Sequence, residues 1–267
     1  MLRCAKSFGT QLVDKNMRQT WELLLAMTER EIKARYKFAV LGFLWIFLNP
    51  LLQMLVIGII FSFVLKVPIP NYFAFLFTGL LVWNFFSMTL LKTTPSIVFE
   101  LGLIEKAKFP REVIVLSIVL SNLFHTVMAF LLFVGVLAVI GQLIWWRVLF
   151  VIVALVWLTI FTSGLSLLTA ALNVRYRDVN FIVQAIMPIW FYATPILYSL
   201  ALVPERLRFF MNLNPLASVV EIFHWALVGG QFPTFSMIAS NAVTSFVVVV
   251  CGWCIFRREA PFFDDWI

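Results

Sequence analysis

Residues 148–174 read VLFVIVALVWLTIFTSGLSLLTAALNV, and this stretch decides the class of fold. It holds 27 residues without one Asp, Glu, Lys or Arg. Its first part, Val148–Leu155, is apolar on every side of a helix, which is typical of a helix surrounded by lipid. Because about 20 apolar residues in a helix cross the hydrocarbon core of a bilayer, the stretch predicts a membrane-spanning helix.

Five further stretches lack charged side chains in the same way: 38–65, 67–91, 113–146, 179–204 and 222–256. Each is long enough to cross the bilayer once as a helix. None shows the alternation of period two that marks a strand of a membrane β-barrel. We therefore predict an all-α membrane protein with six transmembrane helices.

The composition excludes several other classes of protein. Of the 267 residues, 63% are hydrophobic and 12% are charged, and the mean hydropathy is +1.00. A soluble domain carries about 25% charged residues, which cover its surface in water. The chain is therefore not expected to be a soluble enzyme, a disordered chain or a secreted disulfide scaffold.

The basic residues predict the orientation in the membrane. Segments 1–37, 92–112, 175–178 and 257–267 carry 16 Lys and Arg, whereas the opposite loops carry 4. Because basic loops of membrane proteins face the cytoplasm, both termini are predicted to be cytoplasmic. The same distribution explains the net charge of +7 without binding to nucleic acid. The transmembrane domain is then 38–256, between an N-terminal segment and a short C-terminal tail.

Residues 16–37 have the pattern of an amphipathic helix lying in the membrane interface. Apolar side chains fall near one face of this helix, namely Trp21, Leu24, Leu25, Ile32 and Tyr36. One interpretation is a topological anchor among membrane lipids. The other is a collar that receives the anionic head group of a lipid-linked substrate near four basic residues, Arg30, Lys33, Arg35 and Lys37.

The cytoplasmic loop 92–112 predicts a short helix over 96–109, bracketed by Pro95 and Pro110. Proline is accepted at the start of a helix, and the residue before a proline disfavours helix. Three apolar side chains would face water at a cost of about 25 cal/mol per Å² of exposed surface, namely Phe99, Leu103 and Ile104. We expect a partner protein to cover them, or else the membrane surface.

The fifth and sixth stretches differ from the others. Pro188 and Pro195 predict a kinked or broken fifth helix, which membranes accept where neighbours satisfy the freed backbone groups. Segment 203–232 predicts two short re-entrant helices that form an external gate, because its apolar part is too short to span. Glu221 and His224 on this segment are functional candidates, since ionisable residues at membrane depth are rare.

Patterns for catalysis and nucleotide binding are absent from the sequence. There is no G-x-x-x-x-G-K-[ST] motif and no Ser/His/Asp arrangement. His125 and His224 are 99 residues apart, and neither has a second ligand at metal spacing. We therefore predict a chain that is not an enzyme and holds no metal or cofactor. The spans also lack carboxylates, which are among the groups that bind the coupling ion in ion-driven transporters. We therefore expect a partner protein to supply the energy for any transport.

Four segments carry a resemblance to a known family: KFAVLGFLWIFLNP at 37–50, KFPR at 108–111, NVRYRDVNFIVQAIMPIWFYATPILYS at 173–199 and NLNP at 212–215. They resemble the permease subunit of bacterial ABC exporters for polysaccharides, the type that exports lipid-linked O-antigen, capsule or teichoic-acid chains. The most specific part is Arg177-Asp178 followed by the span with two prolines.

The resemblance implies a homodimer in the bacterial inner membrane with two cytoplasmic ABC ATPase subunits, which bind ATP and Mg²⁺. Segment 96–109 would be the coupling helix, and it would contact the ATPase through Phe99, Glu100, Leu103, Ile104, Glu105 and Lys106. Segment 203–232 would be the external gate. Aromatic rings would line the conduit for the polymer, and our candidates are Trp45, Phe47, Phe181, Trp190, Tyr192 and Tyr198.

The predicted function is thus a permease that moves a lipid-linked polysaccharide across the cytoplasmic membrane. An ABC permease for a drug or small lipid would share the coupling loop and is an alternative. A membrane-embedded transferase would need clusters of Asp, Glu or His, for which Asp178 and the pair Glu221 and His224 are sparse candidates. A membrane scaffold without transport is disfavoured by the bracketed loop and the broken span.

Overall fold

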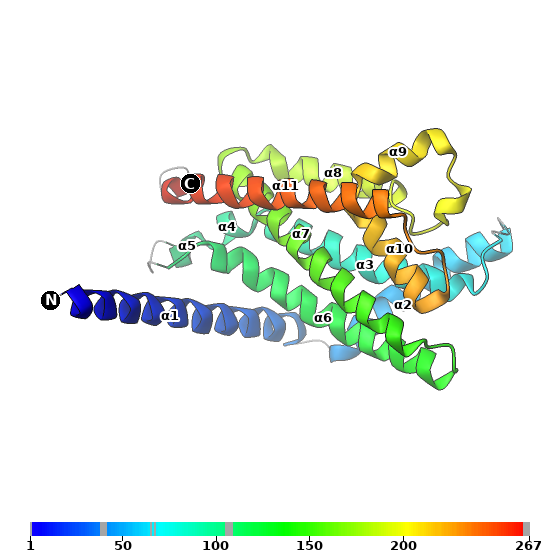
Figure 1. Cartoon of the computed structure of the whole chain (residues 1–267), viewed down its shortest axis with the longest axis horizontal. Coiled ribbons are helices and arrows are strands. Elements are labelled where there is room, and N and C mark those ends of the chain that lie inside the picture. The colour runs from blue at the N-terminus through cyan, green and yellow to red at the C-terminus, as the bar shows by residue number, and fades with distance from the viewer. Residues whose placement is uncertain (1, 38–41, 65, 67, 105–108, 264–267) are drawn as a thin grey trace.

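The computed structural model describes residues 2–37, 42–64, 66, 68–104 and 109–263, and this part of the chain is helical without a strand (Figure 1). Five helices are long and apolar enough to cross a membrane, which confirms an all-α multi-span membrane protein. They are α2 (Trp45–Ile59, continued by a π turn), α3 (Tyr72–Thr93), α6 (Glu112–Val139), α7 (Val148–Arg175) and α11 (Phe235–Glu259). The other helices are α1 (Leu2–Tyr36), α4 (Ser96–Phe99), α5 (Leu101–Ile104), α8 (Asp178–Tyr192), α9 (Glu205–Leu213) and α10 (Pro215–Val228).

The fifth predicted span, 179–204, is broken, as its prolines predict. α8 has 15 residues, and the turn that follows it contains Pro195. Such a helix is about 22 Å long, which is shorter than the ~30 Å hydrocarbon core. Asn214 satisfies the polar groups at the break, because its Nδ2 donates to the carbonyl oxygen of Ala193 at 3.2 Å and to the hydroxyl of Thr194 at 2.9 Å.

Helix α3 lies at the centre of the bundle. Most of its side chains are buried, whereas few of those of α2 and α8 are. The large rings of Phe77, Phe85 and Phe86 are fully buried in a core shared with α6, α7, α8 and α10. Both chain ends lie at one end of the bundle in Figure 1, which we call the terminal end, and α9 and α10 lie at the opposite, distal end.

A second hydrophobic core, the terminal cluster, lies at the terminal end. It joins α1, α4, α5, α6, α7 and α11 through buried side chains, namely Leu24, Met27, Ile97, Ile104, Val113, Ile114, Val115, Leu167, Ala170, Ala171, Val174, Phe256 and Phe263. The two four-residue helices α4 and α5 are too short to be stable by their own hydrogen bonds. Their attachment to the bundle therefore depends on this cluster.

Helix α1 begins earlier than the predicted 16–37 and packs differently from the predicted interfacial helix. It runs along α6, roughly parallel to the long axis of the bundle, instead of across its end (Figure 1). Leu24 and Met27 are buried, whereas Trp21 and Leu25 of the predicted apolar face are 59% and 49% exposed. The reason is that α1 packs on α6 through the side that carries Leu24 and Met27, which coincides only in part with the predicted apolar face.

Helices α7 and α11 approach each other at two glycines. A Cβ atom on Gly252 would lie 2.0 Å from the carbonyl oxygen of Gly164, and a Cβ on Gly164 would lie 2.5 Å from the Cα of Val249. Small residues allow the backbones of membrane helices to pack closely, where dispersion forces favour association. These two positions therefore determine how α11 sits on the bundle.

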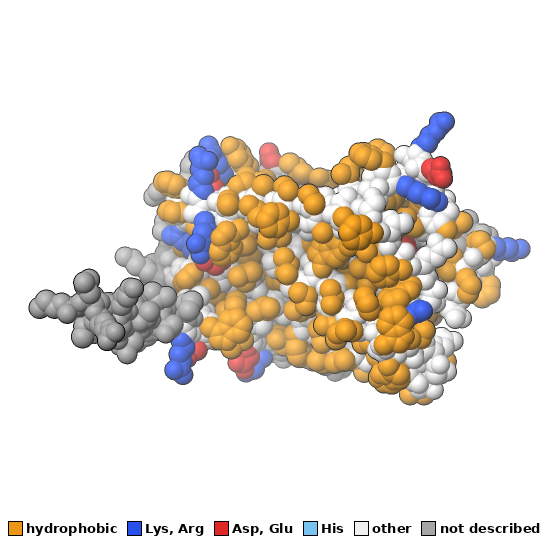
Figure 2. All heavy atoms as spheres, in the orientation of Figure 1, with side chains coloured by type: hydrophobic (Ala, Val, Ile, Leu, Met, Phe, Trp, Pro, Cys, Tyr) orange, Lys and Arg blue, Asp and Glu red, His pale blue; other side chains and the backbone are white. Residues whose placement is uncertain are grey.

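The surface agrees with a protein that crosses a membrane. Figure 2 shows hydrophobic side chains over the middle of the molecule, while acidic and basic side chains gather at its two ends. Lipid tails cover such a band without the cost of exposing it to water.

Candidate functional site

The predicted coupling helix 96–109 is not one helix. α4 and α5 are separated by Glu100, whose φ of −99° and ψ of 21° lie outside the helical region. Gly102, which disfavours helix, follows the break. Glu105 and Lys106, two predicted coupling residues, lie outside the described residues.

The side chains of this coupling segment divide into buried and exposed ones. Ile104 is only 7% exposed, so the prediction that it faces water is wrong, whereas Leu103 is partly buried against the terminal cluster. Phe99 is 80% exposed, as predicted. The difference arises because the segment folds back onto α6 and α7 and leaves one large ring outside. Phe99 therefore projects from a segment most of whose other apolar side chains pack against the bundle.

Ion pairs attach α1 to the coupling segment and to the end of α3. Arg30 on α1 forms an ion pair and hydrogen bond with Glu100, and the neighbouring Glu31 pairs with Lys92 at the end of α3. The hydrogen bond to Glu100 raises the pKa of Arg30 above its ordinary value. Arg30 Nη2 also lies 3.5 Å from Glu31, so the four side chains form one network. We call this set the α1 ion-pair network.

The basic residues predicted to receive a substrate head group are therefore not equivalent. Arg30 belongs to the α1 ion-pair network, and Lys33 pairs with Glu29 one turn away. The hydrogen bond with Lys33 lowers the pKa of Glu29. Arg35 lies deeper along α6, and Lys37 is exposed after the end of α1. Of the four basic residues, Arg30 and Lys33 thus form ion pairs, and Arg35 reaches the interior of the bundle.

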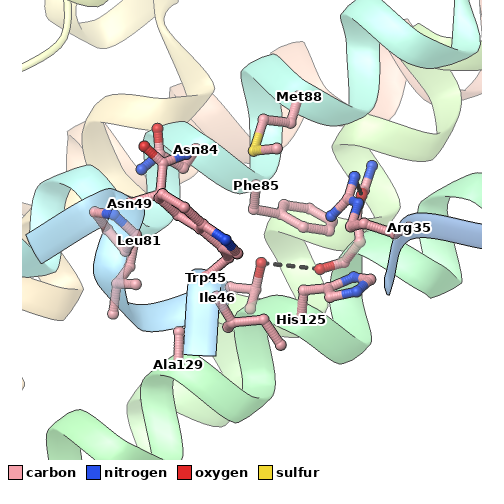
Figure 3. A pocket seen from close by; sticks show the side chains of 13 residues that line it. Arg35, Trp45, Ile46, Asn49, Leu81, Asn84, Phe85, Met88, His125 and Ala129 are labelled. Carbon is pink, nitrogen blue, oxygen red and sulfur yellow. Dashed lines mark hydrogen bonds between the residues drawn. The ribbon is translucent and has the colours of Figure 1, made fainter. Parts of the chain in front are cut away.

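Arg35 reaches a cavity of about 290 Å³ between α2, α3 and α6 (Figure 3). Most of its lining is apolar, but it is the cavity that Arg35 and several amide side chains enter, and we call it the polar cavity for these groups. Its Nη2 donates to Oδ1 of Asn122 at 2.8 Å, and Nδ2 of Asn122 donates to the hydroxyl of Thr89 at 3.1 Å. Further polar side chains line the cavity, namely Asn49, Asn84, Thr126 and His125. Asn84 is also bound by Gln53, to which it donates at 3.1 Å. The cavity therefore combines one cation with several amide groups.

The indole of Trp45, a predicted conduit residue, lies inside this cavity. In Figure 3 Asn49 and Asn84 lie on one side of Trp45, and Arg35 and His125 lie on the other. Trp45 itself is 45% exposed, so its ring is reachable from outside the chain. A volume near 300 Å³ is at the lower end of ligand pockets, enough for a small polar group beside an aromatic ring.

The other aromatic candidates fall into two sets. Phe181 and Tyr192 are 68% and 64% exposed on the uncovered side of α8. Phe47, Trp190 and Tyr198 instead pack against the bundle. Trp190 lies edge-on to Phe86 at 4.9 Å, and its Nε1 donates to Oδ1 of Asn214 at 3.0 Å. In the single chain, Trp190 therefore supports the broken helix and does not present its ring.

The remaining two packed rings have similar constraints. The ring of Phe47 lies 5.5 Å from that of Phe77 beside a second, mainly apolar cavity of about 350 Å³. The hydroxyl of Tyr198 donates to the carbonyl oxygen of Tyr192 at 2.9 Å.

The predicted pair of short distal helices is present as α9 and α10, but the pair Glu221 and His224 is not one site. The His224 ring stacks on Phe75 of α3 at 3.6 Å, and its Nε2 donates to the carbonyl oxygen of Phe75 at 3.1 Å. Glu221 points instead toward α9 and the start of α11, where it lines a separate cavity. Arg147 holds α10 from another side, because its Nη1 donates to the carbonyl oxygen of Trp225 at 3.0 Å.

The motif Arg177-Asp178 forms the connection between α7 and α8 at the terminal end. Asn173 shapes this turn, because its Oδ1 accepts a hydrogen bond from the backbone N–H of Asn180 at 3.2 Å. Asp178 lies in the first turn of α8, where a carboxylate is favoured by the helix dipole. Both motif side chains are exposed, and the neighbouring Tyr176 is 54% exposed. They lie at the same end of the bundle as Phe99.

Several residues of these sites were not predicted, and three of them show why. Glu31 and Lys92 are charged residues in segments that are basic overall, and nothing in the local sequence distinguishes them as partners. Asn122 is an amide in the middle of the charge-free stretch 113–146, and this polarity at membrane depth is a signal that could have identified it.

Comparison with known proteins agrees with this architecture. Residues 22–228 match the sequence profile described as ABC-2 type transporter. The O-antigen export system permease protein RfbA of Myxococcus xanthus is 36% identical over 242 residues, which cover 89% of this chain and 93% of that protein. The protein of the same name from Klebsiella pneumoniae is 33% identical over 247 residues, covering 91% and 94%. The polysialic acid transport protein KpsM of Escherichia coli is 22% identical over 240 residues, covering 88% and 92%. These matches confirm the resemblance found in the sequence, and the chain belongs to the ABC-2 type transporter family.

Proposed function

We propose that this chain is the membrane permease of an ATP-driven exporter that moves a lipid-linked polysaccharide out of the cytoplasm. The observation that carries the proposal is the 80% exposed ring of Phe99 on a segment otherwise anchored in the terminal cluster. A partner that covers this ring gains about 25 cal/mol per Å² of buried apolar surface. The names of the relatives, O-antigen export and polysialic acid transport, support a polysaccharide as the cargo.

The partner we propose is an ABC ATPase, which binds ATP and Mg²⁺ and docks on the terminal end. Phe99 would enter a pocket of the ATPase, while Arg177 and Asp178 supply charged contacts at the rim. Interfaces of this kind place an aromatic anchor at the centre and polar groups around it. In this arrangement the terminal end faces the cytoplasm, the protein lies in the bacterial inner membrane, and both termini are cytoplasmic.

Force from the ATPase would travel through contacts that the chain itself makes. A push on Phe99 moves the coupling segment, which shares the terminal cluster with α6, α7 and α11. The ion pair of Glu100 with Arg30 transmits the same displacement to α1. Five residues further along α1, Arg35 binds Asn122 in the polar cavity, so movement of α1 changes that cavity.

We propose that the polar cavity receives the anionic head group of the lipid carrier and that a second copy of the chain completes the conduit. Arg35 supplies the positive charge for an anion, and amide groups supply further donors. The exposed rings of Trp45, Phe181 and Tyr192 would line the conduit between the two copies. Because sugars stack their C–H faces on aromatic rings, a polymer can move along such rings without a deep binding well.

The test is export in cells together with assembly of the purified proteins. Cells without this chain should lose the surface polysaccharide and accumulate lipid-linked polymer inside, and the chain with its ATPase should restore export. Phe99→Ala should weaken binding of the ATPase by about 30-fold, the equivalent of about 2 kcal/mol for a buried aromatic anchor. Phe235→Ala is the matched control, since Phe235 is 85% exposed at the distal end. Equal effects of the two substitutions, or ATP hydrolysis by this chain alone, would contradict the proposal.

A further inference from the structure

A cavity at the distal end has no role in the function proposed so far. It has a volume of about 230 Å³ and lies between α9, α10 and the start of α11. Polar side chains from three segments line it: Arg208 and Asn212 on α9, Glu221 on α10, and Gln231 before α11. Figure 1 places these helices at the end of the bundle opposite to both termini.

Glu221 is the reason to regard this cavity as a binding site. Its side chain is only 6% exposed, and its Oε1 has no hydrogen-bond partner within the described part of the chain. A backbone hydrogen bond from Leu200 reaches the carboxylate but leaves this oxygen free. A buried acceptor without a donor costs about 1–3 kcal/mol. Such a group at the wall of a cavity points to a ligand that donates a hydrogen bond.

The other groups around the cavity restrict the chemistry of the ligand. Arg208 and Glu221 line the same cavity, yet none of the ion pairs found in the described part of the chain joins them. A calcium ion takes 6–8 oxygen ligands, and one carboxylate beside a guanidinium does not supply them. An anion such as phosphate would be repelled by the buried carboxylate. A neutral ligand with several hydroxyl groups needs no shell of oxygen ligands and is not repelled by the carboxylate.

The geometry agrees with a hydroxyl-rich ligand in two further ways. Asn212 and Gln231 each carry a carbonyl oxygen and an NH₂ group, so they can both accept from and donate to hydroxyls. Phe232 also lines the cavity, and its ring is held edge-on by Trp225 at 4.9 Å and by Phe150 at 6.2 Å. A fixed aromatic ring among amide and carboxylate groups is suited to the C–H face and the hydroxyls of a sugar ring.

We infer that this distal cavity binds a neutral sugar unit of the exported polymer as the polymer leaves the permease. Glu221 accepts from a sugar hydroxyl, Arg208 and Gln231 donate to others, and Phe232 contacts the C–H face of the ring. The inference rests on the proposed function, because it takes the cargo to be a polysaccharide. It adds a saccharide site at the external end, separate from the polar cavity that receives the lipid head group.

The test is direct binding of sugar to the full chain in lipid nanodiscs without ATP. The probe is the oligosaccharide repeat unit of the cell's own exported polymer. The polymer is released from its lipid by mild acid and then cleaved at its glycosidic bonds into repeat units, and binding is followed by saturation-transfer NMR. We expect saturable binding that Glu221→Gln and Gln231→Ala each weaken by about tenfold or more, as for loss of a hydrogen bond to a charged group or of two donors. Glu205→Gln is the matched control, because Glu205 is an exposed carboxylate at the start of α9 outside the cavity.

Several outcomes would overturn the inference. These are failure of the unmodified chain to bind the oligosaccharide, equal binding by the cavity variants, and displacement of the oligosaccharide by inorganic phosphate or calcium. If Glu221→Gln lowers the melting temperature, the sugar affinity of Gln231→Ala is used instead, since Gln231 is exposed and its substitution leaves the packed core unchanged. Export in cells is measured in parallel. Export that needs the chain but not the cavity would refute this inference and leave the proposed function intact.

Discussion

The ion pair between Arg30 and Glu100 joins α1 to the coupling segment, and its removal should uncouple ATP hydrolysis from export. The two side chains are 49% and 29% exposed, so solvent weakens their attraction. Exposed pairs contribute about 0.2–1 kcal/mol, and a pair with one mostly buried member lies at the upper end. We therefore expect a coupling energy of about 1 kcal/mol, which changes the ratio of attached to detached coupling segment about fivefold.

The assay is a double-mutant cycle on the complex with its ATPase in nanodiscs. Arg30→Ala, Glu100→Ala and the double variant are compared for the amount of polymer exported per ATP hydrolysed. Each single variant should lower this ratio about fivefold, and the double variant should be little worse than either, because both remove the same contact. The control is Glu22→Ala, which removes an exposed ion pair with Arg18 inside α1 that joins no second element. Additive effects of the two single substitutions, or an equal effect of the control, would refute the reasoning.

Three further predictions concern packing and the conduit. Gly252→Ala should lower the yield of folded protein by destabilising the α7–α11 contact by about 3 kcal/mol, since the new Cβ would lie 2.0 Å from a carbonyl oxygen of α7. Gly135→Ala, with no atom within 4 Å of the new Cβ, should leave the yield unchanged. Trp190→Phe should lower the melting temperature by the equivalent of about 1 kcal/mol, because it removes the 3.0 Å hydrogen bond to Asn214. Tyr192→Ala, at a 64% exposed position, should slow export without changing the melting temperature, and a parallel loss of stability would indicate packing instead.

The site was predicted unevenly from the sequence. The exposed ring of Phe99 followed from an apolar residue in a charged loop between two prolines. Burial of Ile104 could not be predicted, because it depends on how the segment folds back onto α6 and α7. The same holds for Trp190, which resembles the exposed Tyr192 in its local sequence but faces the opposite side of α8. When the residues of a helix are mostly apolar, the sequence pattern does not show which side of the helix faces the core, since both lipid and core favour apolar side chains.

Composition and local backbone chemistry were enough to predict the class of fold, the number of apolar stretches and the break near Pro195. Which polar side chains pair was settled by the packing of the helices. Arg30 and Glu100 are 70 residues apart, and Arg35 and Asn122 are 87 apart. The physical reason is that hydrophobicity acts on each segment separately, whereas an ion pair or a cavity exists only once several helices have packed in one register.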